Sequence, residues 1–213
     1  GAAEAVGDAL GRVHAASTAA DFDRSPFNNR DDFHALRIEP YLSFTATRHP
    51  ALAQTLNALG TMLYKSSAVL IHGDVSPKNI LFRGSTPLIL DAECATMGDP
   101  CFDPAFCLNH LVLKAFHLPA SRHYLLTSIE AFWRAYAAHV TWEEATDLEA
   151  RVCRLLPALM LARVDGKSPV EYLSKPDRAR VRSFATKGAP SPSVKAFLRA
   201  VVTALEATEH TPQ

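Results

Sequence analysis

Apolar residues recur at helical spacing over most of the chain. In residues 2–16, Val6, Leu10 and Val13 follow one another at intervals of four and three, which predicts an amphipathic helix. A second helix is predicted over residues 50–65, because proline suits the first helical turn and one face carries Leu52, Leu56, Leu59 and Leu63. These stripes indicate helices that pack one face against a common core.

The middle of the chain has a different pattern. Short apolar runs separated by turns predict strands at 69–71, 80–82 and 88–90, and the Gly-Ser-Thr-Pro run between the last two predicts a hairpin. After this region the helical spacing returns, and we expect helices over 103–117, 121–140, 141–164, 176–187 and 193–207. The predicted fold class is therefore mostly α with a small β-hairpin sheet (α+β).

Proline, glycine and capping residues predict where helices break and end. Residues 33–47 are weakly helical, and Pro40 is expected to break or kink them. Thr141 and Glu144 have the spacing of a capping box, which predicts a helix start there. Helix ends are predicted at Gly166 and Gly188.

The composition is that of a folded protein without a strong overall charge. Apolar residues make up 48% of the 213 residues, and 22 basic residues balance 22 acidic ones, so no global field recruits nucleic acid or an anionic membrane. No apolar stretch approaches the length of a membrane span, and the cytoplasm is the expected location. The four cysteines form no C-x-x-C pair and are expected to be buried, reduced thiols.

Polar residues stand at the ends of the predicted strands. Asp74 follows the first strand, Asn79 precedes the second and Asp91 follows the third. If the strands pair in one sheet, these side chains converge at one end of it. Carboxylate and amide oxygens are ligands that suit Mg²⁺, while Asp74 could instead accept a proton from a hydroxyl nucleophile. Each residue alone is typical of a turn, but the joint pattern favours a site.

The spacing of these residues matches the phosphoryl-transfer site of protein kinases. That pattern is H-R-D, four residues and Asn, followed by a metal-binding Asp beyond a hairpin. The present chain has His72-Gly73-Asp74, four residues and Asn79, and then Asp91.

The segments "HGDVSPKNILF" and "LILDAECATMGDPCFDPAFCLNHL", with "ALGRVHAAS" near the start, resemble the aminoglycoside phosphotransferase and choline kinase group of small-molecule kinases. The resemblance implies a protein-kinase-like C-terminal lobe that uses Mg²⁺ and ATP, or another nucleoside triphosphate, to phosphorylate a small-molecule hydroxyl acceptor. It implies that Asp74 is the catalytic base and that Asn79 and Asp91 are the magnesium ligands. His72 would brace the loop, and Asp103 would tie it to the following helix.

Some polar residues near this motif allow two interpretations. Ser76 and Lys78 could reach a γ-phosphate, although a lysine in a loop is often simply solvated. Glu93 either stands close to the metal or pairs with Lys78. A polar break between helices offers a possible acceptor pocket, or else a capped turn with solvated charges, at Arg163, Asp165 and Lys167. His110, on an apolar helix, is expected to be a core histidine.

Two other functions fit the same residues. One is a kinase-like binding or regulatory module without turnover, and the other is a metal-dependent phosphoester hydrolase. A kinase also needs a glycine-rich loop and a strand-borne lysine over the phosphates, and neither pattern occurs in this sequence. We therefore expect residues 1–213 to be the C-terminal lobe alone, with little activity by itself. An N-terminal lobe would come from a longer chain or from a partner.

Overall fold

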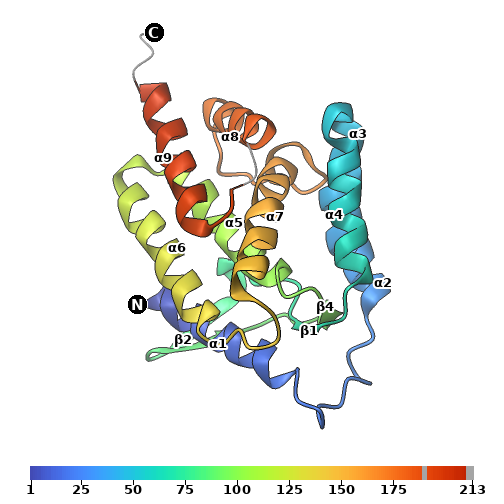
Figure 1. Cartoon of the computed structure of the whole chain (residues 1–213). Coiled ribbons are helices and arrows are strands. Elements are labelled where there is room, and N and C mark those ends of the chain that lie inside the picture. Colours follow the sequence, from blue (N-terminus) through green and yellow to red (C-terminus); the bar gives the residue numbers. More distant parts are fainter. Residues whose placement is uncertain (189–190, 210–213) are drawn as a thin grey trace.

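The computed structural model describes residues 1–188 and 191–209, and it is mostly helical with small antiparallel strand pairs, as predicted (Figure 1). The α-helices are α1 (Ala2–Ala16), α2 (Arg30–Phe33), α3 (Phe44–Arg48), α4 (Ala53–Lys65), α5 (Phe102–His117), α6 (Arg122–Ala137), α7 (Ala145–Asp165), α8 (Lys175–Lys187) and α9 (Val194–Glu209). Short 3₁₀ turns are η2 (Pro50–Leu52), η3 (Pro77–Asn79) and η4 (Pro119–Ser121). A π-helix, η1 (His34–Ser43), joins α2 to α3.

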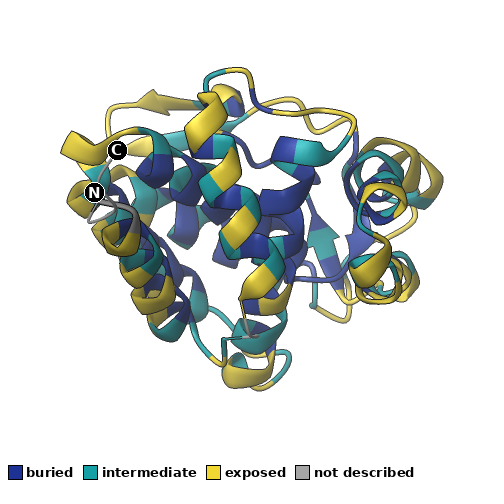
Figure 2. Cartoon of the chain, turned by 90° about the horizontal axis from the view of Figure 1, so that it is seen from above, coloured by how far each residue is buried: buried dark blue, intermediate teal, exposed yellow. Residues whose placement is uncertain are grey.

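The centre of the molecule is α5. This helix lies between α6 and α7, and most of its residues are buried, including Leu108, Val112 and Phe116. Seen from above, the buried positions gather in the middle of the molecule, whereas the outer helices expose their far faces (Figure 2). The helix predicted at 103–117 is therefore buried over most of its surface, and its half-buried positions are His110, Leu111, Lys114 and His117.

Helix α1 packs closely against α6 because glycine stands at the contact. A Cβ atom at Gly7 would clash with the backbone carbonyl of Phe132, so a larger residue would push the two helices apart. The predicted apolar stripe of α1 needs one correction. Val6 and Leu10 are buried, but Val13 is 47% exposed, and His14 occupies the buried position one turn after Leu10.

The strands form two small sheets instead of the single one expected. The predicted hairpin is present, with β2 (Ile80–Arg83) antiparallel to β3 (Thr86–Ile89). However, β1 (Val69–Ile71) pairs with β4 (Thr96–Gly98), a strand that the sequence did not predict. The sequence Thr-Met-Gly is too short and too poor in β-branched residues to signal a strand, and only its pairing with β1 makes it one.

Pro40 does not break its helix. Helical backbone runs continuously through α2, η1 and α3, and Pro40 lies within the π-helical part. Proline cannot donate to the carbonyl four residues before it and its ring collides with that carbonyl in an α-helix. The wider π-helical turn is compatible with such a residue, which explains why the helix continues.

The start of α7 also differs from the prediction, whereas its end agrees. Glu144, not Thr141, is the N-cap residue, and its side chain makes no capping hydrogen bond. The preceding Glu143 carboxylate instead binds the Arg151 guanidinium through two hydrogen bonds of 2.6 and 2.8 Å. The predicted C-terminal residues, Gly166 for α7 and Gly188 for α8, are confirmed as C-caps.

All four cysteines are buried and free, as expected. Among the described residues, no helix combines the length and hydrophobicity required to cross a membrane.

Candidate active site

The loop between β1 and β2, residues 72–79, carries the predicted catalytic residues. It turns sharply at Gly73, where φ is +83° and a Cβ atom would lie 2.8 Å from the Cβ of Cys94. Glycine is therefore required here both for its backbone conformation and for space. Beyond the turn, the carbonyl of Asp74 accepts hydrogen bonds from the N–H of Ser76 at 2.9 Å and from Nδ2 of Asn79 at 3.2 Å. The loop is thus closed on itself around Asp74.

Asp103, in the first turn of α5, holds the beginning of this loop. Its carboxylate accepts hydrogen bonds from the backbone N–H groups of His72 at 2.6 Å and Gly73 at 2.9 Å. Burial alone would raise the pKa of this fully buried carboxyl, but hydrogen bonds from His14 and His72 hold the pKa below its ordinary value. Asp103 therefore stays ionised and ties the loop to the central helix. His72 also accepts the N–H of Asp74 on its Nδ1 at 3.2 Å.

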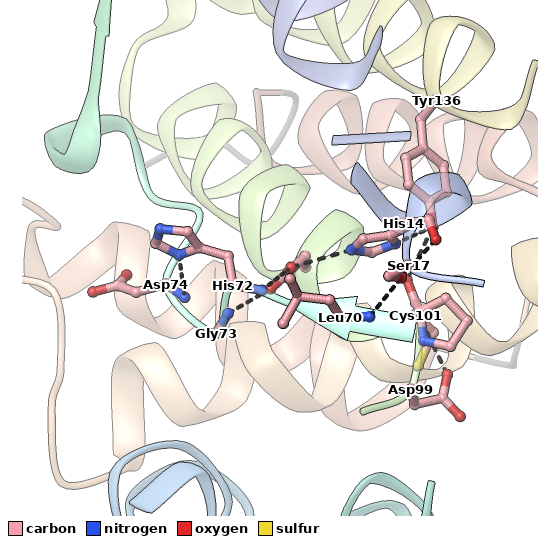
Figure 3. A network of polar contacts seen from close by, with 11 residues as sticks. His14, Ser17, Leu70, His72, Gly73, Asp74, Asp99, Cys101 and Tyr136 are labelled. Carbon is pink, nitrogen blue, oxygen red and sulfur yellow. Dashed lines mark hydrogen bonds and ion pairs between the residues drawn. The ribbon is translucent and has the colours of Figure 1, made fainter. Parts of the chain in front are cut away.

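The network continues into α1 and α6, where Figure 3 labels His14, Ser17 and Tyr136. The ring of His14 contacts Asp103 through Nε2 at 3.3 Å and the hydroxyl of Tyr136 through Nδ1 at 2.9 Å. Ser17, at the end of α1, accepts the N–H of Leu70 in β1 at 2.8 Å. Sequence reasoning missed these residues as support for the loop. For His14 the signal was available, because it follows Val6 and Leu10 at intervals of four.

The Asp74 carboxylate points away from this network (Figure 3) and lies against two cations. Nη2 of Arg37 lies 3.1 Å and Nζ of Lys78 lies 3.6 Å from Oδ2 of Asp74. Arg37 also donates from Nε to the carbonyl of Gly73 at 2.5 Å. The side chains of Arg37 and Asp74 are only 11% and 8% exposed, so this ion pair is weakly screened by water, whereas Lys78 is 72% exposed.

Arg37 was not predicted from the sequence. It lies on the π-helix η1, 36 positions before Gly73, in a segment that carried no motif. Only the packing of η1 beside the loop brings its guanidinium to Asp74. Since Arg37 contacts both the carboxylate and the neighbouring carbonyl, it fixes the orientation of Asp74.

Asn79 and Asp91 are neighbours across the base of the β2–β3 hairpin. The N–H of Leu90 donates to the carbonyl of Asn79 at 2.8 Å, which places Asp91 directly after this contact. Asp91 has φ +69°, an uncommon conformation for a residue other than glycine that is found more often at functional sites. Its exposed carboxylate has no ion pair or hydrogen bond within the described part of the chain.

These donors suit a magnesium ion that is shared with a nucleotide. Nδ2 of Asn79 is engaged with the Asp74 carbonyl, which leaves the amide oxygen free among the described residues, and Asp91 adds a free carboxylate. Both are hard oxygen ligands of the kind Mg²⁺ prefers, and the ion commonly takes its remaining ligands from phosphates and water. Within residues 1–188 and 191–209, no three His, Cys, Asp or Glu side chains form a group that could hold a metal without such help.

The other predicted residues of the loop region differ in their surroundings. Ser76 is buried and its hydroxyl has no hydrogen-bond partner among the described residues. Lys78 is largely exposed, and its ion pair is with Asp74 and not with Glu93. Glu93 is exposed and forms no hydrogen bond or ion pair with the residues that the structure describes, so a position near a metal stays a prediction.

The three residues proposed for an acceptor pocket are not brought together. Arg163 donates from Nη1 to the hydroxyl of Tyr41 at 3.2 Å. Asp165 is engaged with Nε2 of His49 at 2.8 Å and with Arg182, whose guanidinium lowers the pKa of this carboxyl. Lys167 is exposed and pairs with Glu39 at 3.1 Å. Arg163 is connected toward Asp74 by ring contacts, because Tyr41 lies beside Phe106 of α5 and the Phe106 ring lies beside Arg37.

A comparison with protein-family models gives one match. The model described as "Phosphotransferase enzyme family" matches residues 1–148, which include the whole loop region, Asp91 and Asp103. A search of curated proteins finds no match.

Proposed function

Since the chain belongs to the phosphotransferase enzyme family, we propose that it transfers the γ-phosphoryl group of ATP, or of another nucleoside triphosphate, to a hydroxyl of a small molecule. The observation that carries this proposal is the environment of Asp74. Its carboxylate lies in a loop that is closed by hydrogen bonds, with Oδ2 next to two cations and Oδ1 unbound among the described residues.

This arrangement suits a general base. An acceptor hydroxyl would bind to Oδ1 of Asp74 and lose its proton to that carboxylate as its oxygen forms a bond to the γ-phosphorus. The bond between that phosphorus and the bridging oxygen breaks, and the nucleoside diphosphate leaves with the bond electrons. Arg37 keeps the carboxylate in position, so little reorganisation is needed during the reaction.

Asn79 and Asp91 are the residues that would hold Mg²⁺. The ion would neutralise part of the charge on the nucleotide phosphates. Ser76 and Lys78 lie in the same loop, and we propose that they stand near those phosphates. The phosphoester hydrolase is the weaker alternative, because the described residues offer no cluster of His, Asp or Glu for a two-metal site.

The expectation that a separate N-terminal lobe must cover the nucleotide stays a prediction. The same holds for the regulatory module without turnover, which differs from a kinase in activity and not in the placement of these residues.

The test is a screen for ADP release by the full-length gene product, with Mg-ATP and a library of hydroxylated small molecules. We expect acceptor-dependent ADP release that falls by a factor of about 10²–10⁴ in Asp74→Asn, the usual size of a general-base effect. The matched control is Asp21→Asn, an exposed aspartate outside the site. ADP release that needs no acceptor would favour the hydrolase, and nucleotide binding without any turnover would favour the regulatory module.

A further inference from the structure

One face of α5 carries polar residues that the proposed reaction does not use. Phe106, His110 and Lys114 are spaced four residues apart and so point to the same side of the helix. Phe106 connects this face to the active site, because its ring centre lies 5.9 Å from the Arg37 guanidinium, which contacts Asp74. The His110 ring is the next neighbour, with its centre 5.4 Å from that of Phe106.

Two cations flank this face without carboxylate partners. Arg163 on α7 donates from Nη1 only to neutral oxygens, the hydroxyl of Tyr41 and the carbonyl of Ser168. Lys114 lies over the ring of Tyr172, with Nζ 5.1 Å from the ring centre. Within the described part of the chain, neither has an acidic group within ion-pair distance. Both side chains are half-buried, and a half-buried cation without an acidic partner is incompletely compensated.

Three acidic side chains of α7, α8 and the 72–79 loop are committed to other partners. Asp165 binds His49 and Arg182, and Asp177 binds His117 and Arg180. The charge on Asp74 is shared with Arg37 and Lys78. A compensating negative charge near Arg163 and Lys114 would therefore have to come from outside these residues.

The same region contains buried polar atoms that lack hydrogen-bond partners. They are Nε2 of His110, Nε of Arg163 and the hydroxyl of Tyr172. A buried polar group without a partner costs about 1–3 kcal/mol, so their concentration in one place needs a reason. Burial and the charges of Arg163 and Lys114 lower the pKa of His110 to about 4, although Asp74 opposes this, and burial raises the pKa of Tyr172 to about 12. At neutral pH both are uncharged groups that can donate a hydrogen bond.

We propose that His110, Lys114, Arg163 and Tyr172, which we call the α5–α7 cluster, bind a carboxylate or phosphate group of the acceptor. The inference rests on the proposed function and names its substrate class: a small hydroxylated anion whose charge sits between α5 and α7 while its hydroxyl faces Asp74. A cationic or a neutral acceptor would leave the two unpaired cations uncompensated.

Binding of simple anions tests the site without any need for turnover. The probes are inorganic phosphate, glycerate and glycerol phosphate, with glycerol and ethanolamine as the neutral and cationic counterparts, and the readout is the thermal transition of the full chain. We expect the anionic probes to raise the transition temperature and the neutral and cationic probes to leave it unchanged. Stronger stabilisation by glycerate than by glycerol phosphate would identify a carboxylate acceptor, and the reverse order would identify a phosphorylated one. Equal or greater stabilisation by glycerol or ethanolamine would overturn the proposal.

Substitutions test whether the anions bind at the α5–α7 cluster. Arg163→Met and Lys114→Met should each weaken anion binding about tenfold or more, since each removes a charge-assisted contact. Arg163→Lys should recover part of the anion affinity. Arg199 is exposed on α9, and Arg199→Met should bind anions like the parent protein. Since phosphate could also bind in the 72–79 loop, Lys78→Met serves as a second comparison. Loss of binding in Lys78→Met but not in Arg163→Met would place the anion in the nucleotide site and refute the inference.

The two proposals fail in different ways. If the full-length gene product releases ADP with neutral or cationic acceptors at rates that Arg163→Met leaves unchanged, the substrate class is wrong and the kinase stands. If anions bind at the α5–α7 cluster but no anionic acceptor supports ADP release, the proposed function fails while the anion site remains.

Discussion

Asp103 offers the sharpest test of how the 72–79 loop is held in place. Replacing it with alanine removes the carboxylate that accepts hydrogen bonds from the N–H groups of His72 and Gly73 and from the ring of His14. The side chain is fully buried, so water cannot readily take its place. Three polar groups are then left with no partner in the interior.

The expected cost follows from these contacts. An unsatisfied buried donor costs about 1–3 kcal/mol, and breaking a buried charge pair by removing one partner costs about 3–5 kcal/mol. We therefore expect Asp103→Ala to lower the free energy of unfolding by about 3–5 kcal/mol. In a domain of this size that corresponds to a fall of roughly 6–20 °C in the transition temperature. Asp103→Asn, which keeps one acceptor oxygen but loses the charge, should fall between this variant and the parent protein.

The measurement is urea unfolding together with thermal unfolding, and Asp21→Ala, at an exposed loop position, is the matched control. The pH dependence gives a second readout. Because the pKa of Asp103 is lower in the folded protein than its ordinary value of 3.8, its contribution is fully present above about pH 4 and is lost as the pH falls through the folded-state pKa. The difference between Asp103→Ala and the parent protein should therefore shrink under acidic conditions. A stability loss no larger than that of the control would show that the network does not hold the loop.

Three further predictions follow from single residues. Asp91→Ala should abolish magnesium-dependent nucleotide binding, measured by calorimetry. Because the side chain is exposed, the thermal transition without nucleotide should stay nearly unchanged. An unfolded variant would show that Asp91 has a structural role instead. The pKa of His110 falls from 6.5 to about 4 on folding, so protonation of this residue favours the unfolded state as the pH drops. Between pH 6.5 and pH 4, urea unfolding should show that the parent protein loses up to about 3 kcal/mol of unfolding free energy relative to His110→Gln. The same pH dependence of the unfolding free energy in both proteins would contradict this. Arg37→Met should reduce turnover at least about tenfold at unchanged nucleotide affinity, with partial recovery in Arg37→Lys, since the guanidinium orients Asp74; full activity in Arg37→Met would remove it from that role.

The local features of the chain were readable from its sequence. Helix periods, proline at helix starts and glycine at helix ends are set by neighbours a few residues apart, and so the helix after Pro50 and the ends at Gly166 and Gly188 were predicted correctly. The spacing of Asp74, Asn79 and Asp91 could also be recognised from the sequence, because the loop and the hairpin that carry them are continuous in sequence. The family match over residues 1–148 agrees with the resemblance that these motifs carried.

Tertiary packing determined what local patterns do not encode. Strand β4 exists only because Thr96–Gly98 meets β1, and Arg37 reaches Asp74 only because η1 packs beside the loop. The unpaired charges of Lys114 and Arg163 likewise belong to one region only because α5 packs against α7. A sequence shows which groups a chain carries, but the energy of a charge or a polar atom depends on its burial and on its neighbours. For residues far apart along the chain, folding alone determines those neighbours.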